Sequence, residues 1–152
     1  MQVKIKKLVE EAVIPSYAKK GDAGMDLTAV SKKTDSEGNI VYGTGLAFEI
    51  PEGYVGLLFP RSSNAERDML LCNSVGVVDS GYRGEVKMKF KPIYNAVFGN
   101  ELLRENSDKD FNIGERIGQI LIMPYPQIEF VVCDNLSETE RGDGGFGHSG
   151  VK

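Results

Sequence analysis

The side chains most often used in catalysis are scarce in this chain of 152 residues. The only histidine, His148, lies in a glycine-rich tail, so we expect neither a serine–histidine–aspartate triad nor a metal site with several histidines. Two widely separated cysteines, Cys72 and Cys133, do not make a zinc site with it. Carboxylates, arginines and hard metal ions remain. That combination suits phosphate chemistry, in which positioning and charge neutralisation provide most of the catalysis.

Four short segments carry residues of that kind, although each also has an ordinary structural interpretation. Asp79-Ser-Gly-Tyr82 is a turn signal, and Arg61-Ser-Ser63 after Pro60 is typical of a loop that opens a helix. Asp26 fits a solvated turn, and Gln119 fits a side chain that satisfies buried backbone. Singly they predict little, and their order along the chain is more informative than any one of them.

The tail from Ser137 onward loses the apolar pattern of the rest of the chain. Glycine-rich segments can wrap phosphates because bare backbone N–H groups approach closely, but most such segments are simply flexible termini. Phe146 could stack on a base, and Arg141, five residues earlier, could pair with phosphate oxygens. Composition alone leaves both interpretations open.

Short β-branched and aromatic runs separated by many of the 18 glycines predict an all-β domain that positions these residues. In Val86–Lys91, apolar residues alternate with lysines, and Leu46, Phe48 and Ile50 alternate in the same way. Val55–Phe59 and Ile117–Met123 are more continuously apolar, which is typical of interior strands. Pro124 and Pro126 predict an edge or a bend after the last of these strands.

Helical periodicity is limited to Asn64–Leu71, which we predict as one short helix with Ser62 or Ser63 as its N-cap. The polar segment Glu101–Asp110 predicts a long hairpin connection. No internal repeat and no linker divides the chain, so one folded domain is expected.

The net charge of −4 argues against a nucleic-acid groove, which needs a basic face. No apolar run reaches the roughly 18 residues of a membrane span, and no signal peptide is visible. We interpret Cys72 and Cys133 as buried free thiols in a reducing compartment, and expect a soluble, cytoplasmic protein.

Taken in order, these segments resemble the five motifs of the homotrimeric dUTPase family. Ala23–Leu27 is similar to the first motif and Pro60–Ser63 to the second. Asn73–Glu85 matches the third closely, Glu115–Ile120 is similar to the fourth, and Arg141–Gly150 to the fifth. The resemblance therefore covers nearly the whole chain, and the third and fifth motifs are long and specific.

This resemblance implies a jelly-roll-like β-barrel or sandwich at residues 1–136 and a flexible arm at 137–152. It also implies a homotrimer whose active sites lie between subunits, with the arm of one subunit closing over a site built by the others. The implied activity is hydrolysis of dUTP to dUMP and pyrophosphate by attack of water on the α-phosphate. That activity limits uracil incorporation into DNA and supplies dUMP.

The resemblance also implies a role for each matching residue. Asp79 is the carboxylate that activates water, and Arg141 is the arginine that the arm supplies to the γ-phosphate. Asp26 holds Mg²⁺ through water, and Tyr82 packs on the deoxyribose and leaves no room for a 2′-hydroxyl. The other substrate-binding positions are Asn73, Gly76, Val77 and Val78 at uracil, Arg61, Ser62, Ser63, Gln119 and Lys87 near the phosphates, and Phe146, Gly147 and Ser149 in the arm.

Two positions depart from the family pattern. Ser63 stands where the family usually has glycine, and its side chain could either crowd the phosphates or help to bind them. His148 stands in an arm that usually reads Gly-Ser-Thr-Gly. It is either a solvated side chain or a group that reaches the γ-phosphate and adds pH dependence below about 6.5.

Two other functions are compatible with a fold of this type. dCTP deaminase, or a bifunctional relative, shares the Arg-Ser-Ser motif but needs a glutamate about ten residues after the Asp79 position, where this chain has Lys89. A regulatory protein with a dUTPase-like fold that binds a partner protein is the second alternative. Nothing in the sequence identifies such a partner.

Overall fold

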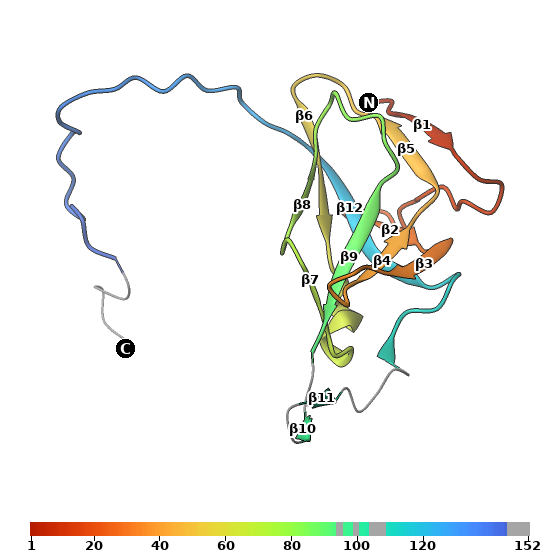
Figure 1. Ribbon diagram of the computed structural model, residues 1–152. Coiled ribbons are helices and arrows are strands. Elements are labelled where there is room, and N and C mark those ends of the chain that lie inside the picture. The colour runs from red at the N-terminus through yellow and green to blue at the C-terminus, as the bar shows by residue number, and fades with distance from the viewer. Residues whose placement is uncertain (94–95, 99–100, 104–108, 146–152) are drawn as a thin grey trace.

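The computed structural model describes residues 1–93, 96–98, 101–103 and 109–145, which form mainly antiparallel β-strands (Figure 1). Two four-stranded sheets have the strand orders β2-β12-β6-β8 and β3-β4-β9-β7, and two-stranded sheets pair β1 with β5 and β10 with β11. The strands are β1 Lys4–Lys7, β2 Met25–Thr28, β3 Ser31–Thr34, β4 Ile40–Gly43, β5 Leu46–Glu49, β6 Tyr54–Phe59, β7 Met69–Leu71, β8 Gly76–Val78, β9 Lys87–Pro92, β10 Ala96–Phe98, β11 Glu101–Leu103 and β12 Arg116–Pro124.

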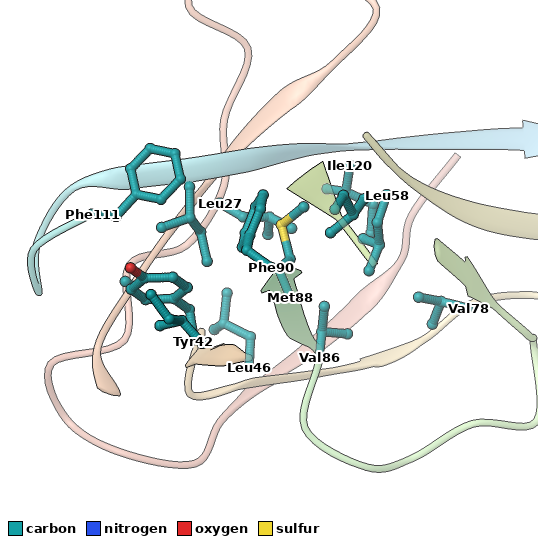
Figure 2. Packing of buried hydrophobic residues seen from close by; sticks show 14 of the residues in the cluster. Leu27, Tyr42, Leu46, Leu58, Val78, Val86, Met88, Phe90, Phe111 and Ile120 are labelled. Atoms are coloured by element: carbon teal, nitrogen blue, oxygen red, sulfur yellow. The ribbon is translucent and has the colours of Figure 1, made fainter. Parts of the chain in front are cut away.

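One hydrophobic core joins the two four-stranded sheets (Figure 2). Leu27, Leu58 and Ile120 enter it from the β2-β12-β6-β8 sheet, and Met88 and Phe90 enter it from β9 of the other sheet. All five side chains are buried. This layering confirms the prediction of an all-β, jelly-roll-like sandwich.

Three aromatic rings close one end of the core (Figure 2). The ring centroids of Tyr42, Phe90 and Phe111 lie 5.6–5.9 Å apart, and Tyr42 meets each of the other two edge to face. Aromatic pairs of this kind are worth about 0.5–1.5 kcal/mol each beyond the area they bury. Arg67 stacks on the Phe111 ring, with its guanidinium carbon 4.5 Å from the centroid. The cluster thus fixes the segment that leads into β12.

Strand β9 confirms the predicted alternation. Met88 and Phe90 are buried, while Lys87, Lys89 and Lys91 are exposed. Lys89 forms an ion pair with Asp35 of the β3–β4 turn at 3.0 Å, and this lysine holds the pKa of the Asp35 carboxyl well below its usual range. The lysine at the position where a deaminase needs glutamate therefore belongs to the outer face of a sheet.

The predicted helix is mostly wrong. A short 3₁₀ helix, η1, spans Ser62–Glu66, and its N-cap is Arg61, without a side-chain capping bond. Residues Met69–Leu71 form β7, in which Met69 and Leu71 are buried and Leu70 is 61% exposed. The burial of Met69 and Leu71 alternates with the exposure of Leu70, which is the period of a strand. Three apolar residues in a row are also compatible with the predicted helix, so the sequence does not distinguish the two.

Two smaller predictions also need correction. Cys72 and Cys133 are free, as expected, but both are exposed, because they lie in the turn after β7 and in the segment after β12 rather than in the core. The connection predicted at Glu101–Asp110 begins later than expected, since Glu101–Leu103 pair with Ala96–Phe98 as strands β11 and β10. Residues 104–108 lie outside the described part of the chain.

The last strand, β12, ends at Pro124, where a bend was predicted. From Tyr125 to Gly145 the chain leads away from the two sheets without further strands (Figure 1). Among the described residues, no helix has the length and apolar character needed to span a membrane.

Candidate functional site

The predicted nucleotide-binding residues fall into two groups on the surface. The first group surrounds the turn after β8. Strand β8 contributes its backbone at the edge of its sheet, where one side pairs with β6 and the other side has no strand partner in the described part of the chain. An open strand edge presents N–H and C=O groups in alternation, which is the pattern needed to read the polar edge of a base. A cavity of about 250 Å³ lies here, lined among others by Asn73, Gly76, Val77, Val78, Asp79, Tyr82 and Lys87. All seven residues were predicted from the sequence.

The turn that carries Asp79 is closed by a hydrogen bond from the Tyr82 N–H to the Asp79 carbonyl at 3.0 Å, as the turn signal predicted. The Asp79 side chain is exposed, so its carboxylate can meet water and a ligand. Arg83 donates from Nη1 to the Ser80 carbonyl at 2.5 Å and to the Tyr82 carbonyl at 3.0 Å. These bonds stabilise the loop from within, through its own backbone carbonyls, and they do not involve the Asp79 carboxylate.

The Glu85 side chain anchors the far end of the same loop. Its Oε1 accepts a hydrogen bond from the Gly45 N–H at 2.9 Å, and its Oε2 lies 3.1 Å from Nζ of Lys87. The Val86 N–H donates to the Leu46 carbonyl at 2.8 Å. Hydrogen bonds therefore attach the loop to the start of β5, and the ion pair with Glu85 fixes the position of the Lys87 ammonium group.

The second group lies in a cleft of about 680 Å³ at the other edge of the same sheet. Asp26 of β2 is its centre, because Oδ1 accepts from Nε of Arg61 at 2.7 Å and Oδ2 accepts from Nη1 of Arg116 at 3.0 Å. Arg61 also donates to Oγ of Ser63 at 3.2 Å. Asp22 also lines the cleft, so two guanidinium groups face two carboxylates there, and the arginines still offer the paired N–H donors that suit a phosphate ligand.

Gln119 and Ser62 also line this cleft. Gln119 donates from Nε2 to the Pro60 carbonyl at 3.0 Å, which connects β12 to the loop after β6. Gly24 lies against the same amide, since a Cβ there would sit 3.2 Å from Cδ of Gln119 and collide with its Oε1. Because Gly24 has no side chain, the Gln119 amide can occupy this space.

Sequence reasoning missed Arg116 as a member of the site. The available signal was its place in the fourth motif, Glu115–Ile120, three residues before Gln119. Its ion pair with Asp26 joins residues 90 positions apart, so no local pattern reveals it. The neighbouring Glu115 accepts from the Asn112 N–H and from Arg67, and these donors lower the pKa of the Glu115 carboxyl.

The two groups are separated within one chain. Strand β8, which ends one residue before Asp79, pairs with β6 as far as Gly56. Asp26 pairs with Gln119, which in turn pairs with Phe59. Strands β2 and β8 are thus opposite edges of the sheet, about 14 Å apart across three strand spacings and offset by about 10 Å along the strands. A single copy does not bring Asp79 to the arginine cleft.

The described part of the tail lies apart from both groups. Arg141 donates from Nε to the Gly144 carbonyl at 2.9 Å within a local turn, and it lines neither cavity. Phe146, Gly147, His148 and Ser149 lie outside the described residues.

A metal ion would find two carboxylates among the residues that line the arginine cleft, Asp22 and Asp26. No group of three or more His, Cys, Asp or Glu side chains in the described residues could form an all-protein cage. Mg²⁺ does not require such a cage, because it keeps several waters and binds through one or two carboxylates together with phosphate oxygens. One or two carboxylates beside a candidate phosphate cleft fit this ion.

Comparison with known proteins relates this geometry to one family. The family model described as dUTPase matches residues 10–150. A deoxyuridine 5′-triphosphate nucleotidohydrolase of Nautilia profundicola is 42% identical over 154 residues, covering 99% of each chain. Among solved structures, a variant dUTPase of Staphylococcus bacteriophage 80alpha with dUpNHpp matches with a TM-score of 0.80 and 30% identity over 99% of each chain. A variant dUTPase of phage phi11 of S. aureus, described with a structural Mg(II) ion, matches with a TM-score of 0.71 and 26% identity over 89% of this chain and 98% of that chain.

Proposed function

The chain belongs to the dUTPase family, and we propose that it hydrolyses dUTP to dUMP and pyrophosphate at a site shared between copies of the chain. The observation that carries the shared site is the separation of the Asp79 turn from the arginine cleft. Each half has what the other lacks, since one half offers a base-reading edge with a carboxylate and the other offers cations for phosphates. A second copy can bring the two halves together.

Asp79 is the proposed general base for the attacking water. An ordinary aspartate is a weak base at neutral pH, so its contribution depends on placement close to the reacting phosphorus. The closed turn and the exposed carboxylate support this placement. Water then attacks the α-phosphorus, the bond to the bridging oxygen breaks, and pyrophosphate leaves.

Uracil is the proposed ligand of the open edge of β8. Backbone groups of Gly76, Val77 and Val78, with the Asn73 side chain, line the cavity there. Backbone donors and acceptors can pair with O4 and N3 of uracil and reject the reversed pattern of cytosine, because unpaired buried groups are costly. Tyr82 at the same cavity is the proposed platform for the deoxyribose.

The triphosphate is the proposed ligand of Arg61, Ser62, Ser63, Gln119 and Arg116, with Lys87 on the Asp79 side. Ser63 stands where the family usually has glycine, and its hydroxyl accepts from Arg61 in this structure. That contact supports a helpful rather than a crowding role for Ser63. Bound Mg²⁺, held through water by Asp26, would neutralise phosphate charge.

The assembly is proposed to be a homotrimer in which the tail of one copy covers another. Ile128, Phe130, Val131 and Val132 are 69%, 88%, 82% and 99% exposed on a segment without a strand partner among the described residues. Apolar surface of this extent on a single copy indicates a contact with another chain. In the trimer, Arg141 and the arm residues Phe146, Gly147 and Ser149 would then reach a neighbouring site.

The activity is tested by pyrophosphate release from dUTP, dCTP, dTTP and UTP, each with and without Mg²⁺. We expect dUTP to be the only good substrate and turnover to need the metal. Ammonia release from dCTP measures the deaminase alternative, which the Lys89–Asp35 ion pair disfavours. Equal hydrolysis of all four nucleotides, or deamination of dCTP, would overturn the proposal.

A further inference from the structure

The Tyr82 side chain folds back over Gly84. Its hydroxyl donates to the Glu85 carbonyl at 3.1 Å. A Cβ at position 84 would collide with the Tyr82 hydroxyl and would lie 2.6 Å from Cζ of the ring, closer than real Cβ atoms lie, and 3.0 Å from Cε2. The ring therefore occupies the space that any side chain at position 84 would need.

The support under this ring is fixed on both sides. The Glu85 carboxylate is tied to the Gly45 N–H and to Lys87, and the Val86 N–H is tied to β5 through the Leu46 carbonyl. The carbonyl that receives the Tyr82 hydroxyl therefore belongs to an anchored segment. Tyr82 itself is 47% exposed, so its position depends on this one hydrogen bond and on the free space over Gly84 rather than on core packing.

We propose that Gly84 is a specificity-positioning residue, whose missing side chain lets the Tyr82 ring take the position that rejects ribonucleotides. This inference rests on the proposed role of Tyr82 at the deoxyribose. A side chain at position 84 would displace the ring by the distance needed to relieve the contact. Because a ring packed on the sugar discriminates by close fit, such a displacement makes room for a 2′-hydroxyl.

The test compares kcat/KM for dUTP and UTP in Gly84→Ala and in a matched control, Gly81→Ala. Neither glycine has a left-handed backbone, so alanine is compatible with both positions, and a Cβ at Gly81 meets nothing within 4 Å. We expect the ratio of the two kcat/KM values to fall roughly tenfold in Gly84→Ala and to keep its value in Gly81→Ala. An unchanged ratio in Gly84→Ala would overturn the proposal.

The Tyr82→Ala background shows whether Gly84 acts through the ring. If it does, Gly84→Ala has no effect on the ratio when Tyr82 is already alanine, and an equal effect in both backgrounds contradicts the proposal. If Tyr82→Ala alone leaves the ratio unchanged, the proposed role of Tyr82 fails instead. Should Gly84→Ala not fold, Tyr82→Phe decides the question, because it removes only the hydrogen bond to Glu85 and must lower the ratio.

Discussion

Arg61 donates from Nε to Oδ1 of Asp26 across 2.7 Å and so ties the loop after β6 to strand β2. The other oxygen of the same carboxylate, Oδ2, accepts a hydrogen bond from Arg116 at the start of β12. Asp26 therefore organises two cations that come from segments far apart in sequence. This arrangement explains why an acidic chain, with a net charge of −4, can still offer a local site for phosphates.

Replacing Asp26 by asparagine tests its role in holding the arginines. The loss of a charge-assisted hydrogen bond is worth about 1.5–3 kcal/mol, so we expect kcat/KM for dUTP to fall roughly 10- to 100-fold. The same hydrogen bonds are lost from the folded protein, and the Asp26 and Arg61 side chains are only about a quarter exposed, so the free energy of unfolding should also fall, by about 1–3 kcal/mol. Steady-state kinetics and urea unfolding measure the two effects. A large loss of stability with unchanged kinetics would contradict this role.

Arg116→Gln tests the residue that sequence reasoning missed. Removing one cation from the cleft should raise KM for dUTP roughly tenfold and make KM less sensitive to added salt. Lys91→Gln removes the same charge from an exposed position on β9 and serves as the control for net charge. Equal effects of the two substitutions on KM would show that Arg116 acts only through the overall charge.

The Glu115 carboxyl predicts a pH dependence of stability. Its pKa in the folded protein is lowered from 4.5, first by the hydrogen bond from the Asn112 N–H and also by Arg67. A lowered pKa means that the folded state prefers the ionised form, so this contribution is complete above about 4.5 and is lost as the pH falls through the lowered value. In Glu115→Gln, the free energy of unfolding should therefore fall less steeply as the pH is lowered. Urea unfolding between neutral pH and pH 3 measures this slope. An identical slope in the variant would refute the assignment.

Arg141→Gln tests whether the tail contributes to catalysis without contributing to the stability of the folded domain. Arg141 contacts only its own turn in the described structure, so the midpoint of thermal unfolding should not change. By analogy with arginines supplied in trans, we expect kcat to fall by up to roughly 10³-fold while the mass of the assembly stays unchanged. Kinetics, thermal unfolding and the mass of the assembly are the measurements. A variant with full activity would remove Arg141 from the proposed machinery.

The alternation in β9 and the continuous apolar run of β12 predicted their strands correctly, because a period of two and two-sided burial leave direct traces in sequence. The Met69–Leu71 strand was missed because three apolar residues in a row fit a helix and a strand equally well. Cys72 was predicted to be buried because free cysteines usually are, whereas it lies exposed in the turn after β7.

Most residues of the candidate site were predicted from the motifs, with Arg116 as an exception, but their placement on the sheet was not. Motif order says nothing about which sheet edge each motif occupies, and only the strand order places Asp26 and the Asp79 turn at opposite edges. Likewise, the Arg116–Asp26 ion pair and the close approach of Tyr82 to Gly84 are tertiary contacts, which depend on side-chain packing rather than on local pattern.

The shared site is tested most directly by mixing two inactive variants, Asp79→Asn and Arg61→Ala. A site that takes Asp79 from one copy and Arg61 from another is intact in part of the mixed assemblies, and with random mixing roughly a quarter of the sites would be of that kind. Co-expression of the two variants should therefore restore roughly that share of the wild-type rate of pyrophosphate release from dUTP, whereas each variant alone stays at background. If mass spectrometry finds mixed assemblies and no activity returns, Asp79 and Arg61 act within one copy and the account is wrong.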